Sequence, residues 1–353
     1  MRFATFATLL LSSAIASAYE VGLDADLYLA GSARHLDSDF EPAEDDFEAV
    51  NNASQLGLGG HFRSGDLSAF VRISGGEKNA KAGIEALREL YAGVDSPYGQ
   101  LMLGRGASMY RTSGERLDPF YDTSIAGFNG REATEGAGYG LSNLSNGYSK
   151  QMVSYTTPAI AGLRLNVAGY FGEEDAPNDE TDMGYGAEYQ VQGMTADKDL
   201  IIGVQYLDIK NPVSFAAGNE DRNEMLAVGG SPGISESYRV HGSYRSGPFS
   251  VGASFEHVDV AAEPEPRGYL LVSSSYALDD KTRLAASYGM LDFETGSPAL
   301  SGNGYSLGVF HNLGYGIKSY LAARWVELDS AGEAATVAFG LSYSFRRKKS
   351  WGA

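Results

Sequence analysis

Apolar and polar residues alternate with a period of two along most of this chain. The last segment is the clearest case, because one of its faces holds Val337, Phe339, Leu341, Tyr343 and Phe345. The residues between them are small or polar: Ala338, Gly340, Ser342 and Ser344. Successive side chains of a β-strand point to opposite faces, so this period predicts strands with one apolar and one polar face.

Sixteen segments show this alternation, and most have the length of about 9–11 residues that a tilted strand needs to cross a bilayer. They cover residues 21–33, 53–63, 67–74, 87–95, 100–106, 149–157, 163–171, 183–191, 199–208, 235–245, 249–258, 268–277, 282–291, 304–312, 317–326 and 335–345.

The connections between these segments alternate between short turns and long loops. The long loops cover residues 34–52, 75–86, 107–148, 172–182, 209–234, 259–267, 292–303 and 327–334. Outer-membrane barrels have short periplasmic turns and long outer loops. An even number of strands also lets the last strand pair with the first and so removes both open edges. The sequence therefore predicts an all-β fold, a transmembrane, antiparallel, 16-stranded β-barrel.

A soluble, secreted all-β binding protein is the alternative fold. In such a protein the apolar faces would point inward, and small and charged residues would cover the whole outside. After residue 18 the chain has no run of 18 apolar residues, so no transmembrane helix is expected. A barrel gives only a weak hydropathy signal because half of its residues face water, and the 45 glycines and 22 tyrosines fit that case.

The first 18 residues have the features of a signal peptide. Arg2 supplies a positive charge, an apolar stretch follows from Phe3 to Ile15, and Ala16-Ser17-Ala18 has the small-x-small pattern of a cleavage site. An N-terminal membrane anchor is the alternative, although the apolar stretch is short for a span. The prediction is a signal peptide at 1–18, a barrel at 19–345 and a basic C-terminal tail at 346–353.

Charge and cysteine content exclude several classes of function. The formal net charge is −18, and it becomes −19 without the signal peptide, because Arg2 is the only charged residue removed. This charge argues against nucleic-acid binding, because phosphate binding needs a basic face. The absence of cysteine excludes zinc–thiolate sites and thiol catalysis. The five histidines lie in different segments with no pattern of a catalytic triad, which disfavours a barrel enzyme, although triads need only spatial closeness.

The polar face of the strands carries many bases. Those on the polar parity are Arg63, Arg72, Arg164, Arg239, Arg245, Arg283, Lys318 and Arg324. Arg or Lys on the lipid face would cost about 2–4 kcal/mol at the bilayer midplane, so these side chains should face the lumen. The predicted pore-lining residues are Asp24, Asp26, Arg164, Arg239 and Arg324. Any one of the arginines could instead be a rim charge or a strut that holds a loop.

Several segments resemble the general diffusion porins of Gram-negative bacteria. They are Arg88–Val94 with Tyr98–Arg105, Val153–Pro158 with Ala161–Leu163, and Asp118-Pro119-Phe120 in the longest loop. The resemblance implies an outer-membrane channel for passive diffusion of small hydrophilic solutes and ions, assembled as a homotrimer in contact with lipid and lipopolysaccharide. One departure concerns the C-terminus, because relatives usually end on Phe, whereas here Phe345 is followed by Arg346–Ala353.

The resemblance also implies that loop 107–148 folds into the barrel and narrows the pore. This loop is too long for a plain connection. The predicted constriction places loop carboxylates opposite wall arginines, namely Glu115, Asp118, Asp122 and Glu132 facing Arg63, Arg72 and Arg105. Aromatic residues in the loop, such as Tyr110 and Tyr121, leave a substrate-specific channel open as an alternative.

The outer loops are strongly acidic, and no cofactor is expected apart from loop-bound Ca²⁺ or Mg²⁺. Asp45, Asp46, Glu173 and Glu174 are weak candidate ligands, because hard cations prefer oxygen ligands and could bridge to lipopolysaccharide phosphates. Their spacing matches no EF-hand, so a solvated acidic mouth is the simpler interpretation. Such a mouth concentrates cations and predicts weak cation selectivity.

Overall fold

The computed structural model describes residues 19–38, 47–52, 54–76, 87–126, 139–146, 148–171, 182–192, 198–208, 234–260, 265–292, 301–329 and 332–352. Its strands are β1 (Tyr19–Ser38), β2 (Phe47–Asn51), β3 (Gln55–Ser64), β4 (Leu67–Gly75), β5 (Leu87–Ser96), β6 (Gly99–Ala107), β7 (Tyr148–Thr156), β8 (Leu163–Tyr170), β9 (Asp182–Gln192), β10 (Lys198–Asp208), β11 (Ile234–Ser246), β12 (Phe249–Val260), β13 (Arg267–Ala277), β14 (Thr282–Asp292), β15 (Gly302–Gly314), β16 (Ile317–Leu328) and β17 (Gly332–Gly352). The helices described are α2 (Met109–Leu117) and the 3₁₀ turn η2 (Asn143–Asn146).

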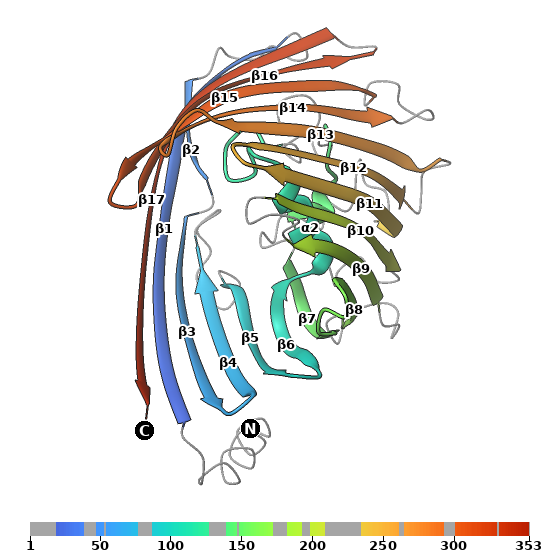
Figure 1. The fold of residues 1–353 in the computed structure, drawn as a ribbon. Coiled ribbons are helices and arrows are strands. Elements are labelled where there is room, and N and C mark those ends of the chain that lie inside the picture. The colour runs from blue at the N-terminus through green and yellow to red at the C-terminus, as the bar shows by residue number, and fades with distance from the viewer. Residues whose placement is uncertain are drawn as a thin grey trace.

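The strands form one antiparallel sheet that curves around a central space (Figure 1). Each strand from β3 to β17 pairs with its neighbour in the chain, and β1 pairs with both β17 and β3, so the ladder returns to its start. β2 and β3 occupy one position in this ring, because β2 pairs with Gly31–His35 and β3 with Tyr19–Tyr28 of the same β1. The described strands therefore confirm the predicted 16-stranded barrel.

The two faces of the strands differ as the alternation predicted. In β17, Val337, Phe339 and Leu341 are about half exposed, whereas Thr336 and Ala338 are buried. The outward face thus presents apolar side chains, which suits lipid, and the inward face holds small and polar ones. Neither described helix is long and apolar enough to cross a membrane.

Loop residues fill part of the interior. α2 lies inside the ring of strands (Figure 1), where it contacts η2 and β9 to β12. The side chain of Ser108 caps α2 by accepting a hydrogen bond from the Arg111 backbone N–H. An inward-folded loop is therefore present, and buried loop residues such as Phe120, Ile125 and Leu141 pack against the barrel wall.

The C-terminal segment differs from the prediction of a separate basic tail. β17 continues through Gly352, and its residues 346–352 pair with residues 20–26 of β1. The reason is that β1 begins at Tyr19 and offers a backbone partner along this whole stretch, so the strand pairing continues past Phe345 even though residues 346–350 are all polar. Opposite charges meet across this ladder, because Arg346 lies opposite Asp26 and Lys348 opposite Asp24.

Candidate functional site: the channel interior

One group of charged side chains lies on the inner wall around Arg72 of β4. Its guanidinium donates to both carboxylate oxygens of Asp26, at 2.6 and 3.1 Å, and its Nε donates to Glu89 Oε2 at 2.8 Å. Asp24 Oδ2 lies 3.8 Å from Arg72 Nη1. These four side chains are each 17–19 % exposed, so they remain accessible to solutes. We call Asp24, Asp26, Arg72 and Glu89 the wall cluster.

Glycines of β3 make room for the wall cluster. A Cβ atom at Gly57 would lie 2.7 Å from Asp26 Oδ2 and from Arg72 Nη2, and one at Gly59 would lie 2.5 Å from Asp24 Oδ1. A side chain at either position would displace the charged groups. The absence of side chains on the adjacent strand therefore lets the carboxylates lie flat against the wall.

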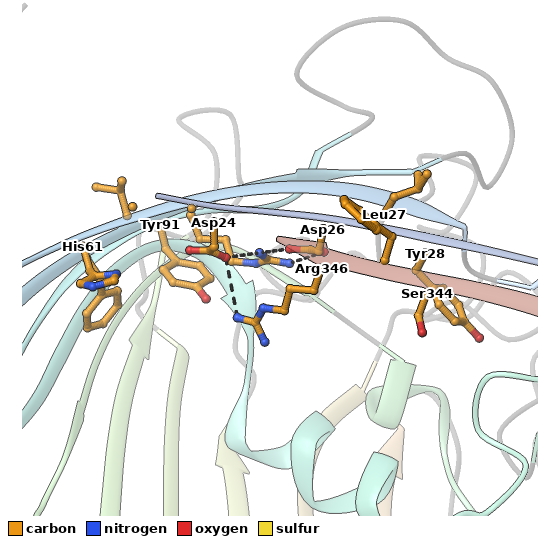
Figure 2. Close-up of a pocket in the computed structure, with 14 residues that line it drawn as sticks. Asp24, Asp26, Leu27, Tyr28, His61, Tyr91, Ser344 and Arg346 are labelled. Carbon is orange, nitrogen blue, oxygen red and sulfur yellow. Dashed lines mark hydrogen bonds and ion pairs between the residues drawn. The ribbon is translucent and has the colours of Figure 1, made fainter. Parts of the chain in front are cut away.

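A cavity of ≈ 760 Å³ lies beside the wall cluster. Its lining includes Asp24, Tyr28, His61, Arg72, Tyr91 and Arg346. Figure 2 shows His61, Tyr91, Arg346, Tyr28 and Ser344 on one side of the strands, whereas Leu27 points to the other. Arg346 Nη2 lies 3.7 Å from Asp24 Oδ2, and the Arg346 side chain is 60 % exposed. The C-terminal strand thus contributes a base to the channel interior.

A second arginine–carboxylate group is fully buried between the loop and the wall. Arg239 Nη2 donates to Glu256 Oε2 at 2.9 Å, and both side chains are 0 % exposed. Arg239 Nη1 also donates to the carbonyl oxygen of Tyr110, at 2.6 Å. Glu256 accepts from the Tyr110 hydroxyl at 2.7 Å and from the Ser142 backbone N–H at 3.1 Å. We call this arrangement the latch, because one ion pair holds both α2 and the segment before η2.

Other wall residues hold the remaining described part of the loop. Arg324 Nη1 donates to the carbonyl oxygen of Ala126 at 3.1 Å, and the Ser273 hydroxyl donates to that of Leu117 at 2.5 Å. The Phe120 ring lies 5.7 Å from the Phe310 ring, in an apolar cluster on β14 to β17. The loop is therefore attached to the barrel at several separate points.

The exposed side of the loop carries two carboxylates, Glu115 and Asp122, near Arg111. Arg111 donates to the Tyr148 hydroxyl at 3.1 Å, and its Nε lies 3.8 Å from Glu115 Oε2. Glu115 and Asp122 are exposed to the interior space. Partial removal from bulk water raises the pKa of both loop carboxyls, and the positive charge of Arg111 opposes this shift.

A β-bulge turns one further arginine towards the loop. Ser74 pairs with Glu89 and Gly75 with Leu87, which leaves Arg88 as the extra residue in β5. Arg88 lies within electrostatic range of Tyr148, Arg111 and Asp122. By alternation alone Arg88 shares the parity of apolar residues, so its direction could not be assigned from the sequence.

The structure brings some of the predicted site residues together. Asp24, Asp26 and Arg72 form the wall cluster, although the first two were expected to line the pore and Arg72 to form the constriction. Arg105 lies near Tyr148. Arg164 and Arg63 are exposed, and Arg63 lies opposite Glu20 at the end of β3. Glu132 and the weak metal candidates Asp45, Asp46, Glu173 and Glu174 lie outside the described residues.

Three predicted positions differ in the structure. Arg239 and Arg324 are buried behind the loop, where they act as struts and do not line open water. Asp118 is also buried, and its Oδ1 accepts from the Phe120 backbone N–H at 2.9 Å, so it caps a turn. The reason is the same in each case, because the folded loop covers surfaces that would otherwise face the pore.

Sequence reasoning did not select Glu89 or Arg346 as site residues. Both lie on the polar parity of their strands, and that signal could have found them. Among the described residues, no group of three or more His, Asp or Glu side chains is arranged to hold a metal ion.

Comparisons with known proteins support this architecture. The family model of the Gram-negative porin matches residues 4–331. An outer membrane porin protein of Bordetella pertussis is 26 % identical over 233 residues, which is 61 % of this chain but only 56 % of that relative, little more than half its length.

Solved structures show a similar fold. An anion-selective porin from Comamonas acidovorans has a TM-score of 0.68 at 16 % identity, with 92 % of this chain and 100 % of that chain covered. A trimer form of OmpT from Vibrio cholerae has a TM-score of 0.60 at 16 % identity, with 92 % and 99 % covered.

Proposed function

The chain belongs to the Gram-negative porin family, and we propose that it forms a water-filled channel for passive diffusion of small hydrophilic solutes and ions. As a porin it is a protein of the outer membrane, and it is not an enzyme. The observation that carries the proposal is the inward polar face of the barrel, with charged groups on the wall and on the exposed side of the loop. Such groups favour hydrated solutes over apolar ones.

The proposed assembly is a homotrimer embedded in outer-membrane lipid and lipopolysaccharide. The trimer form of the similar OmpT supports the assembly. The outward apolar face supports contact with lipid. Binding of Ca²⁺ or Mg²⁺ by Asp45, Asp46, Glu173 and Glu174 remains a prediction for the outer loops, to be tested by titrating either ion.

The sign of the ion selectivity has two candidates. Weak cation selectivity is supported by the net charge of −18, much of it in outer loops that would concentrate cations at the mouth. Weak anion selectivity is favoured by a different observation, the number of bases on the polar parity of the wall, among them Arg63, Arg72, Arg164, Arg283 and Lys318. The similar Comamonas acidovorans porin is itself anion-selective.

Reconstitution in a planar lipid bilayer under a salt gradient tests both parts of the proposal. Stepwise conductance in groups of three would support a trimeric channel. A cation-signed reversal potential would support the first candidate, and an anion-signed one the second. No conductance from folded protein would overturn the proposed function and leave the family and fold unchanged.

A further inference from the structure

The cavity beside the wall cluster contains two charged groups, Asp24 and Arg346, whose ion pairs are longer than a hydrogen bond. Asp26 accepts a bidentate pair of hydrogen bonds from Arg72, and Glu89 accepts from Arg72 and Ser74. Asp24 differs, because its Oδ2 lies between two guanidiniums at 3.8 and 3.7 Å, beyond hydrogen-bond distance. Arg346 has Asp24 as its ion-pair partner at this long distance and is well exposed.

These two groups lie side by side at the edge of the cavity. Asp24 is on β1 and Arg346 is on β17, and the antiparallel register places Arg346 opposite Asp26, two residues along β1 from Asp24. Figure 2 shows both side chains on the cavity side of the strands, joined by a dashed line that marks their ion pair. A carboxylate and a guanidinium are therefore presented together to whatever enters the cavity.

The charges around the cavity disfavour a ligand that carries only a positive or only a negative charge. The wall cluster has three carboxylates, and Arg72 and Arg346 supply two guanidiniums. A simple anion would meet the carboxylates, and a simple cation would meet the guanidiniums. A small ligand that carries both charges can pair its ammonium group with Asp24 and its carboxylate with Arg346, which forms charge-assisted hydrogen bonds at both ends.

The remaining lining suits the side chain of such a ligand. The rings of Phe70 and Tyr91 meet edge to face at 6.1 Å between centroids, and both residues line the cavity. Tyr28 and Ser344 add hydroxyl groups on the other side of Arg346. Aromatic walls with a few placed polar groups are typical of small-molecule sites.

We propose that this cavity is a binding site for small zwitterionic α-amino acids on their way through the channel, with Asp24 and Arg346 as the two recognition groups. The proposal rests on the proposed channel function and adds a solute class to it. It also gives the unusual segment after Phe345 a role, because without that segment Arg346 would be absent from the wall.

The test is single-channel recording in a planar bilayer with L-serine as the probe. L-serine should interrupt the current in a saturable, concentration-dependent way. An equimolar mixture of acetate and ethylammonium, which carries the same charges on separate molecules, should have a weaker effect. Asp24→Asn and Arg346→Gln should each raise the half-blocking concentration roughly tenfold or more, the effect expected for losing one hydrogen bond to a charged group.

Arg347→Gln is the matched control variant. Arg347 is the next residue of the same strand, opposite Ala25, and lies on the outward parity, so it loses the same charge from the other face. It should keep the block by L-serine. Normal conductance with no block, or equal loss of block in Arg347→Gln and Arg346→Gln, would overturn the proposal while the channel function stands. No conductance in the unmodified protein would instead overturn the channel function.

Discussion

The wall cluster and the latch use the same chemistry in two different environments. Each has an arginine of the barrel wall bonded to a carboxylate of an adjacent strand, Arg72 to Glu89 and Arg239 to Glu256. The wall-cluster side chains keep 17–19 % of their surface exposed, whereas the latch keeps none. Water can therefore reach the first group, whereas the second bonds only to protein groups. The comparison teaches that the position of the loop decides which wall arginines stay exposed to the interior space and which are buried as structural struts.

The largest expected effect follows from breaking the latch. Glu256→Ala leaves the Arg239 guanidinium buried without its counter-charge, which should lower the free energy of unfolding by about 3–5 kcal/mol. It also removes the acceptor of bonds from Tyr110 and Ser142, so the loop should loosen and single-channel conductance should rise. Urea unfolding in detergent and single-channel recording measure the two effects.

Arg245→Ala is the control for that change. Arg245 lies on the same strand as Arg239, but its side chain is 68 % exposed and its ion-pair partner Asp199 lies 4.0 Å away. An exposed pair of this kind contributes little. If Arg245→Ala destabilises the protein as much as Glu256→Ala does, burial is not what distinguishes the latch.

A smaller effect on stability, but a clear one on selectivity, is expected for the wall cluster. Arg72→Ala removes the charge that Asp26 and Glu89 share, yet water can solvate both carboxylates. We expect the free energy of unfolding to fall by roughly 1.5–3 kcal/mol, the range for hydrogen bonds to charged groups. The reversal potential should shift towards cations, because the wall loses a positive charge and keeps its negative ones. A shift of the reversal potential towards anions would contradict the conclusion that the wall cluster is accessible to permeating ions.

Lowering the pH should move the ion selectivity towards anions. The pKa of Glu115 and of Asp122 is raised, so both carboxyls gain a proton at a higher pH than a free side chain would. As pH falls, the loop loses negative charge while Arg111 stays positive, and the reversal potential should move towards anions. The double change Glu115→Gln with Asp122→Asn should reduce this pH dependence. An unchanged pH profile in that variant would assign the effect to other acids.

The smallest effect is expected at a turn far from both clusters. Asp279 Oδ1 accepts from the backbone N–H groups of Lys281 and Thr282, each at 2.7 Å, and these bonds lower its pKa. The contribution of Asp279 to stability is thus present above its unfolded pKa of about 3.9 and is lost as pH falls through the lower folded value. Asp279→Ala should remove this part of the acid sensitivity.

Asp280→Ala provides the control for the turn. Asp280 is the adjacent exposed acid and caps no described backbone N–H group. Urea unfolding at several acidic pH values should therefore separate the two variants. Equal curves for both would show that the hydrogen bonds of Asp279 contribute nothing measurable.

Much of the barrel could be predicted from the sequence because strands follow from a local pattern, the alternation of apolar and polar residues. The alternation in residues 317–326 or 282–291 predicts β16 and β14 within two residues of their observed ends. The short strand β2 was not predicted, because residues 47–51 fell within the predicted loop 34–52. Asn52 and Ser54 bond to Ala30 of β1 there, an arrangement that depends on a partner strand.

The candidate site was less predictable. The positions of Arg239 and Arg324 on the polar face of their strands correctly predicted that both side chains point inward. Their burial depends on a loop far away in the chain, since the partners of Arg239 include Tyr110 and Ser113. Arg88 could not be placed because a bulge overrides alternation. The segment from Arg346 onwards looked like a tail because its strand partner, β1, lies at the other end of the sequence.

The sequence by itself determined most of the strands, which face of each strand is apolar, and the alternation of turns and loops. These features follow from a period of two and from turn residues close together in the chain. Only the tertiary structure decided which inward charges meet water. That outcome depends on which distant segments cover which part of the wall, and hydrogen bonds such as those from Tyr110 and Ser142 to Glu256 select one loop position. Such contacts join residues more than a hundred positions apart, and no local pattern encodes them.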